Sequence, residues 1–175
     1  MRIVKKNLRI FAVIVFTFLF GEEQDTRGFI VKVGDDCPPF KAELINESTI
    51  TLDSLLGEVT LIQFTASWCS VCRVEMPHIE KEIWQIYRAK GLNVIGVDRD
   101  EPLEVVKEFA KTMKITYPLA LDPGANVFSL FAERNSGVTR NIVIDKSGKI
   151  AFLTRLYNPI EFQEMIGVID RLLKE

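Results

Sequence analysis

The chain has 175 residues, of which 47% are hydrophobic, and a formal net charge of −2. This length supports one domain with a sizeable core, and the composition is that of an ordinary globular protein rather than a disordered one. The near-neutral charge argues against nucleic acid as a partner.

The first 21 residues have the pattern of an export segment. Residues 2–9 carry four basic side chains and no acidic one, and residues 10–20 are apolar apart from Thr17. This run is shorter than the about 20 residues that a transmembrane helix needs. We predict a signal peptide or an N-terminal membrane anchor over residues 1–21, with a buried N-terminal element as the alternative. Residues 22–29 are expected to link it to a domain over residues 30–175.

Short runs rich in β-branched and aromatic residues alternate along this domain with segments of helical spacing. In chain order we expect strands 40–44 and 48–52, a helical turn at 53–57, strand 59–65, helix 70–90, strand 92–97, helix 102–113, strand 118–121, helix 125–132, strands 141–144 and 149–154, and helix 160–173. Within the longest helix, Pro77 is expected to cause a kink, and Ile86 is expected on its buried face.

This order predicts an α/β fold of three layers. An N-terminal β-hairpin is followed by strands that alternate with helices, and a second hairpin precedes the last helix. Such alternation is typical of a central sheet with helices on both faces. Residues 59–65 are almost continuously apolar, as expected of a strand at the centre of a mixed sheet.

Two cysteines, Cys69 and Cys72, follow this central strand and begin the longest helix. Residues i and i+3 share one helix face, so the two sulfurs can form and break a disulfide with little backbone movement. The helix N-terminus offers free N–H groups that favour a thiolate. We predict thiol–disulfide exchange, with Cys69 as the exposed attacking thiol and Cys72 as the buried resolving thiol.

Two other interpretations of this pair are weaker. A permanent disulfide across a two-residue gap would restrict the unfolded chain very little. A zinc site would need two further ligands, and the chain offers only Cys37 and His78. We therefore expect neither a metal nor a cofactor, and we interpret Cys37 as a half-buried small residue and His78 as a solvated one.

The order of elements, with Trp68 directly before the cysteine pair, resembles the thioredoxin superfamily and, within it, the TlpA/ResA branch of extracytoplasmic thiol–disulfide oxidoreductases. The segments that carry the resemblance are residues 33–40, 52–57, 61–77, 91–113 and 137–150. The outline is also shared with AhpC/TSA peroxiredoxins. The resemblance implies a thioredoxin-like fold for about residues 30–174 and an exchange reaction outside the cytoplasm.

Partners and location follow from the same resemblance. It implies protein thiols and disulfides as substrates, with apocytochrome c as one example, and a membrane thiol as the electron donor. It implies a periplasmic protein, free or tethered to the inner membrane through its N-terminus. The dipeptide Ser70-Val71 lacks the histidine of strongly oxidising CPHC-type relatives, which favours a reductase.

One departure from the family pattern is Thr139, at the position where the family usually has a cis-proline that faces the cysteines. Threonine needs a trans peptide here, or a cis bond that costs about 3 kcal/mol. Its hydroxyl could bond a sulfur or a partner's backbone. We expect Trp68, Val138 and Thr139 to form the substrate-docking surface, and Arg140 to lie at the surface of the protein.

A second departure is Gln63, which stands where many thioredoxins have a buried aspartate. Because Gln63 cannot ionise, Glu75 becomes the candidate to exchange a proton with Cys72, three residues before it on the same helix face. A glutamate at this position also occurs in ResA-like proteins. Burial would raise its pKa, whereas an exposed helix glutamate is the alternative.

Two rival functions remain open from the sequence. A thiol peroxidase needs the loop Pro-x-x-x-Thr/Ser-x-x-Cys, but Ile62 and Ala66 occupy the proline and hydroxyl positions before Cys69. A redox-inactive binding or chaperone module that keeps the fold is the other rival, and Thr139 is its main support. Reduction of insulin with dithiothreitol would separate such a module from an enzyme.

Overall fold

A computed structural model describes residues 27–175, so the predicted export segment lies outside the described residues. Ordered contacts begin within the expected linker. Phe29 is buried and pairs with Ala132 across an isolated β-bridge. None of the helices in the described part of the chain is long and apolar enough to cross a membrane.

Seven strands of the described chain form one mixed sheet in the order β2-β1-β5-β4-β3-β6-β7. They are β1 (Lys41–Leu44), β2 (Thr49–Thr51), β3 (Val59–Thr65), β4 (Leu92–Arg99), β5 (Leu119–Asp122), β6 (Arg140–Ile144) and β7 (Ile150–Arg155). β3, β4 and β5 run parallel, and the other neighbouring pairs are antiparallel. The predicted mixed sheet and N-terminal hairpin are confirmed, and β3 has the predicted bounds.

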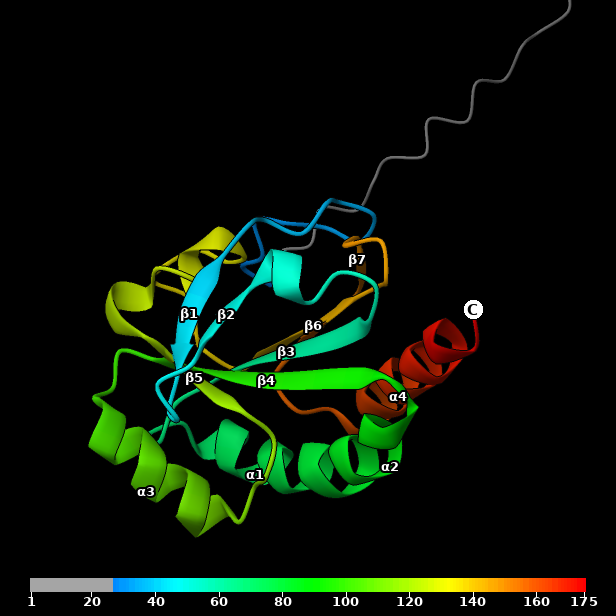
Figure 1. The fold of residues 1–175 in the computed structure, drawn as a ribbon. Helices are drawn as coiled ribbons and strands as arrows, with labels where there is room; N and C mark the ends of the chain where they lie inside the picture. Colours follow the sequence, from blue (N-terminus) through cyan, green and yellow to red (C-terminus); the bar gives the residue numbers. More distant parts are fainter. Residues whose placement is uncertain (1–26) are drawn as a thin grey trace, which may run out of the picture.

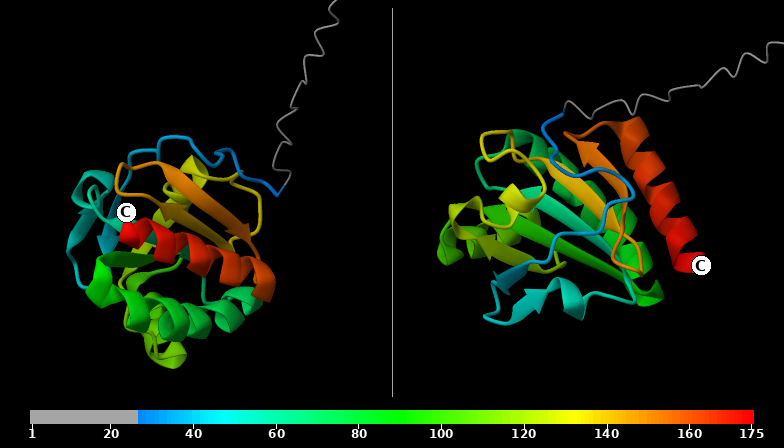
Figure 2. Two further views of the ribbon diagram at one scale, coloured as in Figure 1. Left: turned by 90° about the vertical axis from the view of Figure 1, so that its right-hand side faces the viewer. Right: turned by 90° about the horizontal axis from the view of Figure 1, so that it is seen from above.

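The helices of the described chain are unevenly divided between the two faces of the sheet. They are α1 (Ser70–His78), the π-helical η2 (Ile79–Trp84), α2 (Gln85–Tyr87), α3 (Leu103–Met113) and α4 (Pro159–Lys174), with 3-10 turns η1 (Leu52–Ser54), η3 (Arg88–Lys90), η4 (Pro123–Ala125) and η5 (Phe128–Leu130). Figures 1 and 2 show α1, α2 and α3 on one face, with α4 alongside, and the N-terminal segment with the short turns over the other.

The predicted helix over residues 70–90 forms as a continuous helical segment, but not as a regular α-helix. Pro77 has no N–H to donate, and the chain continues as the π-helix η2 before it returns to α2. After this wider turn Tyr87 is buried, whereas Ile86 is 49% exposed, so its predicted burial is wrong. Gly91, with a φ of 90°, ends the segment as predicted.

The predicted helix over residues 125–132 is also wrong, because two separate 3-10 turns, η4 and η5, take its place. The backbone is left-handed at Gly124 and at Ala125, with φ of 73° and 50°, so a helix can neither begin at residue 125 nor continue from the first turn into the second. The carboxylate of Asp122 accepts the N–H groups of Val127 and Phe128 at 2.8 and 2.9 Å. The Asp122 side chain thus satisfies N–H groups that have no backbone carbonyl partner at the start of a helical turn.

The central strand β3 is buried along its whole length because its side chains alternate between the two covered faces. Phe64 points away from α1 and meets the rings of Phe128 and Phe131 at 5.3 and 5.6 Å. Gln63 and Thr65 point towards α1, where they bond Glu75 and Met76 respectively. The polar side chain of Gln63 is therefore buried on the face of the sheet that packs against α1.

Candidate active site

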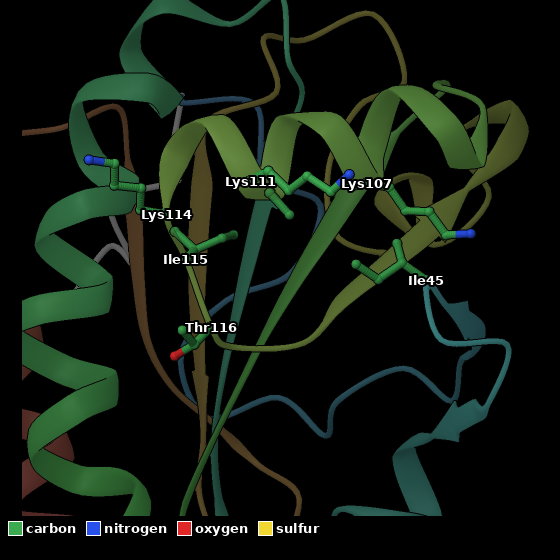
Figure 3. Close-up of a pocket in the computed structure, with 7 residues that line it drawn as sticks. Ile45, Lys107, Lys111, Lys114, Ile115 and Thr116 are labelled. Carbon is green, nitrogen blue, oxygen red and sulfur yellow. The ribbon is translucent and has the colours of Figure 1, made fainter.

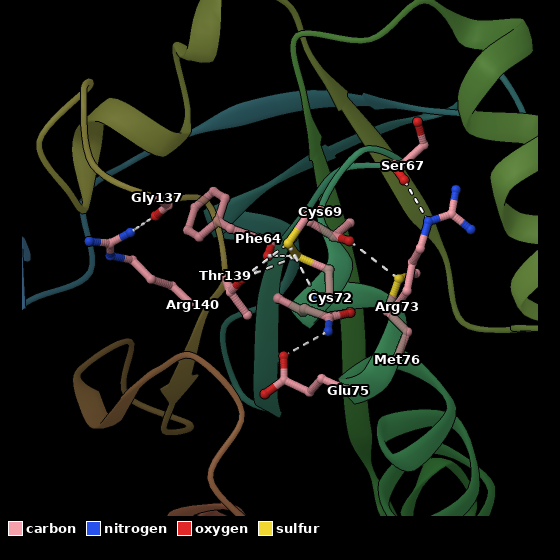
Figure 4. Close-up of a disulfide and its surroundings, with 12 residues drawn as sticks. Phe64, Ser67, Cys69, Cys72, Arg73, Glu75, Met76, Gly137, Thr139 and Arg140 are labelled. Carbon is pink, nitrogen blue, oxygen red and sulfur yellow. Dashed lines mark hydrogen bonds between the residues drawn. A yellow bond between two sulfur atoms is a disulfide. The ribbon is translucent and has the colours of Figure 1, made fainter.

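Cys69 and Cys72 form a disulfide at the N-terminus of α1, directly after β3 (Figure 4). Cys69 caps the helix, and its sulfur accepts the N–H of Cys72 at 3.2 Å. Cys72 is fully buried and Cys69 is 8% exposed. Cys69 is the more exposed of the two cysteines, as predicted, but it is nearly buried, whereas an exposed thiol was expected.

Thr139 covers the two sulfurs and lies where the family resemblance placed a facing residue. Its hydroxyl oxygen is 3.1 Å from the sulfur of Cys69 and 3.3 Å from that of Cys72. The peptide before it is trans, like all others in residues 27–175. The carbonyl of Thr139 accepts the N–H of Leu156 at 3.3 Å and the guanidinium of Arg155 at 3.4 Å. Thr139 is thus fixed against the disulfide.

Glu75 lies one helical turn after Cys72 and is buried, which excludes the exposed alternative. Its two carboxylate oxygens accept the side-chain amides of Gln63 at 3.1 Å and Asn141 at 2.7 Å. Gln63 in turn accepts the hydroxyl of Tyr117 at 2.7 Å. Burial raises the pKa of Glu75 to about 7, although the two amide donors oppose this shift. The carboxyl group can therefore take up or release a proton near neutral pH.

The segment before Cys69 is held by a residue that the sequence analysis did not identify, Glu101 in the connection between β4 and α3. Its carboxylate accepts both the N–H and the hydroxyl of Ser67, each at 2.5 Å. Arg73 on α1 donates to the carbonyl of the same serine at 2.7 Å. The next residue, Trp68, is 63% exposed. A loop held by these hydrogen bonds thus presents an exposed indole ring directly before Cys69 in the chain.

Asp98, at the end of β4, is a second buried carboxyl that sequence reasoning missed. In the parallel register it lies beside Thr65, two residues before Ser67. Burial raises its pKa to about 8, and the nearby charges of Glu101 and Asp122 add to the shift. At neutral pH Asp98 is therefore mostly protonated. Its position at the carboxyl end of a central parallel strand was the signal that could have identified it.

The predicted surface location of Arg140 is wrong, because its side chain is fully buried. It donates to the carbonyl groups of Gly137 and Arg27, the latter at 2.7 Å. Its guanidinium also lies 5.0 Å from the centre of the Phe29 ring and 5.4 Å from that of Phe128. Carbonyl oxygens and aromatic faces together compensate the buried charge.

The remaining candidates lie apart from this chemistry. Cys37 is a free, buried thiol, and burial raises its pKa to about 12, so it stays protonated at neutral pH. His78 is half-buried, bonds Glu82 at 2.6 Å and stacks on Tyr157 at 5.0 Å. Within residues 27–175 no group of three or more histidine, cysteine, aspartate or glutamate side chains could hold a metal ion.

The described chain also has a shallow groove between the end of α3 and the turn after β1 (Figure 3). The residues that line it include three lysines, Lys107, Lys111 and Lys114, and two isoleucines, Ile45 and Ile115. None of the residues that line it belongs to the surroundings of the disulfide. The groove is therefore separate from the exchange site.

Comparison with known proteins places this geometry in a family. The AhpC/TSA family model matches residues 33–153. The thiol-disulfide oxidoreductase ResA of Bacillus cereus is 30% identical over 154 residues, which cover 84% of this chain and 87% of that protein.

Solved structures of similar proteins have the same fold. A protein of Bacteroides thetaiotaomicron, provisionally named a protein disulfide isomerase, is 52% identical with a TM-score of 0.82, over 85% of this chain and 94% of that one. A Chlorobium tepidum protein, provisionally named thiol:disulfide interchange protein DsbE, shares the fold at 24% identity, with a TM-score of 0.73 over 82% of this chain and 99% of that one. The chain therefore belongs to the AhpC/TSA family of thioredoxin-like proteins, as a ResA-like thiol–disulfide oxidoreductase.

Proposed function

We propose that this oxidoreductase works as a reductase of protein disulfides outside the cytoplasm. The observation that carries the proposal is the asymmetry of the pair, because Cys69 caps the helix and is the less buried sulfur, while Cys72 lies fully inside. The dipeptide between them, Ser70-Val71, has no histidine to stabilise the reduced form as in strong oxidants. We expect a potential nearer to thioredoxin, at about −270 mV, than to DsbA, at about −120 mV.

The reaction runs in two displacements. The Cys69 thiolate attacks one sulfur of the substrate disulfide, so a mixed disulfide forms and the second substrate sulfur leaves as a thiolate. Cys72 then attacks Cys69, which closes the disulfide of the enzyme and releases the first substrate sulfur. Two electrons pass from the dithiol to the substrate, and a membrane thiol donor returns the enzyme to its reduced form.

Glu75 acts as the general base for the second displacement. It lies one turn after Cys72, and its pKa of about 7 suits a group that accepts a thiol proton near neutral pH. Its two amide partners, Gln63 and Asn141, hold the carboxylate in place. This role replaces that of the buried aspartate found in many thioredoxins.

Trp68, Val138 and Thr139 form the proposed docking surface for the substrate. The exposed ring of Trp68 supports this role, because it lies directly before the attacking cysteine. The side chains of Val138 and Thr139 are buried. Their part of the surface is therefore expected to consist of backbone groups beside the disulfide.

The first 21 residues support an extracytoplasmic location, since four basic residues precede an apolar run. In the periplasm the substrates would be proteins with cysteine pairs, and apocytochrome c is one candidate. Fractionation of cells that express the full chain should find it in the periplasm or on the inner membrane. Recovery in the cytoplasm would overturn this part of the proposal.

The activity itself is tested by reduction of insulin with dithiothreitol. The wild-type protein should accelerate the reaction, Cys69→Ser should not, and Cys72→Ser should accumulate mixed disulfides whose partners can be identified. A potential above about −150 mV would refute the reductase direction. Peroxide consumption by Cys72→Ser at the wild-type rate would favour a thiol peroxidase instead.

A further inference from the structure

We propose that Thr139 is a catalytic residue of the exchange reaction, whose hydroxyl donates a hydrogen bond to whichever of the two sulfurs carries the negative charge. The inference rests on the proposed function of Cys69 and Cys72 as an exchange pair. It assigns chemistry to the position where the family resemblance led us to expect a proline, which has no hydrogen-bond donor.

The first support is geometric. The hydroxyl oxygen of Thr139 lies beside the disulfide and within reach of both sulfurs, at 3.1 Å from Cys69 and 3.3 Å from Cys72 (Figure 4). A hydroxyl carries one proton and rotates freely about its C–O bond. It can therefore turn from one sulfur to the other without movement of the backbone.

The second support is the unequal supply of donors to the two sulfurs. Cys69 accepts the N–H of Cys72 at the start of the helix. The sulfur of Cys72 is fully buried, and its other neighbour is the carbonyl oxygen of Phe64 at 4.0 Å. A carbonyl oxygen does not stabilise a thiolate. Among the described contacts of Cys72, the hydroxyl of Thr139 is therefore the group that can do so.

The third support is that Thr139 is held in place before any substrate arrives. It is 2% exposed, and its carbonyl is bonded by Leu156 and Arg155. The next residue, Arg140, starts β6 and is buried. A hydrogen bond to a charged group counts for more in such a site, because few waters compete for it.

The hydroxyl would serve both displacements. While Cys69 is the attacking thiolate, the hydroxyl bonds Cys69. When Cys72 has given its proton to Glu75, the hydroxyl turns to the new Cys72 thiolate until the disulfide closes. Thr139 keeps its own proton throughout, so the electrons still pass only from the two cysteines to the substrate disulfide.

The test compares Thr139→Val, which removes the hydroxyl at nearly constant shape, with Thr139→Ser, which retains it. Each is combined in the full chain with Cys37→Ala and with either Cys72→Ser or Cys69→Ser, so that one thiol remains, and iodoacetamide alkylation of that thiol is followed from pH 5 to 10. Loss of one charged hydrogen bond should lower the thiolate fraction about tenfold in Thr139→Val, a shift of about one pH unit in the alkylation midpoint. In Thr139→Ser the midpoint should return towards the wild-type value.

Thr60→Val is the matched control, because Thr60 is also buried and its hydroxyl has no hydrogen-bond partner among the described residues. It should leave both midpoints unchanged. Unshifted midpoints in Thr139→Val, or equal shifts in Thr139→Val and Thr139→Ser, would overturn the inference. Alkylation needs no protein substrate, so a wild-type protein that fails to reduce insulin would refute the proposed function and not this hydrogen bond.

Discussion

Glu75 shows how far a single residue depends on its surroundings. The same side chain on an exposed helix face would be fully ionised at pH 7. Here burial raises its pKa to about 7, and the amides of Gln63 and Asn141 limit the rise by stabilising the carboxylate. The result is a group that is half ionised at the pH at which a thiol proton must be removed.

Glu75→Gln should slow the step in which Cys72 resolves the mixed disulfide. Glutamine has nearly the same shape but cannot accept the thiol proton, so we expect a loss of about hundredfold in that step. The rise in rate around pH 7 should also disappear. Stopped-flow measurement of substrate release between pH 5.5 and 9 checks both effects.

Glu164→Gln is the control for this change, because Glu164 is an exposed glutamate on α4. It should behave like the wild-type protein at every pH. A wild-type pH profile in Glu75→Gln would show that another group takes the proton.

At the scale of elements, the side chain of Leu119 on β5 covers its neighbour Gly96 on β4, so that only glycine fits there. A Cβ on Gly96 would lie 2.3 Å from a methyl carbon of Leu119 and 3.3 Å from the ring of Tyr117. Leu119 is fully buried and cannot move aside freely. Because Tyr117 bonds Gln63, which bonds Glu75, the packing of these strands is connected to the buried carboxyl of Glu75.

Gly96→Ala should therefore destabilise the protein by about 1–3 kcal/mol through overpacking. It should also shift the pH at which Glu75 acts, since Tyr117 must move. Gly167→Ala is the matched control, because no atom lies within 4 Å of a Cβ at Gly167 on the exposed side of α4. That change should stabilise the protein by about 1 kcal/mol. Urea unfolding measures both, and a neutral Gly96→Ala would contradict the packing argument.

At the scale of the whole molecule, three buried carboxyls whose pKa is raised, Glu75, Asp98 and Asp122, make stability depend on pH. The pKa of Glu75 rises from 4.5 to about 7 on folding, and that of Asp98 from 3.8 to about 8. At any pH between a carboxyl's unfolded and folded pKa, the folded state binds more protons than the unfolded state. The free energy of unfolding must therefore fall as the pH rises through this window.

We predict a continuous loss of stability of the oxidised protein from pH 5 to pH 8. For Glu75 alone, the shift of about 2.5 pH units corresponds to about 3 kcal/mol. Glu75→Gln should remove this part of the loss, and Asp98→Asn should remove a further part up to pH 8. Urea unfolding at four pH values measures the slopes, and a wild-type stability that is flat or rises would refute the prediction.

Much of this protein was determined by local sequence. The apolar run of β3 predicted a central strand with the correct bounds, and Gly91 predicted the end of the long helical segment. Both features depend on residues that are close together in the chain. The spacing of Cys69 and Cys72 at a helix start fixed the disulfide and its chemistry. Glu75 was identified for the same reason, since it shares a helix face with Cys72.

Only the tertiary structure decided what surrounds that disulfide. Thr139 meets Cys69 across 70 residues of sequence, and Glu101 holds Ser67 across 34. The burial of Arg140 and of Asp98 likewise depends on which strands and segments pack against them. No local pattern encodes these contacts, because they arise where the ends of separate strands meet in the folded sheet. The sequence thus determined the pair of sulfurs, and the fold determined which groups lie around them.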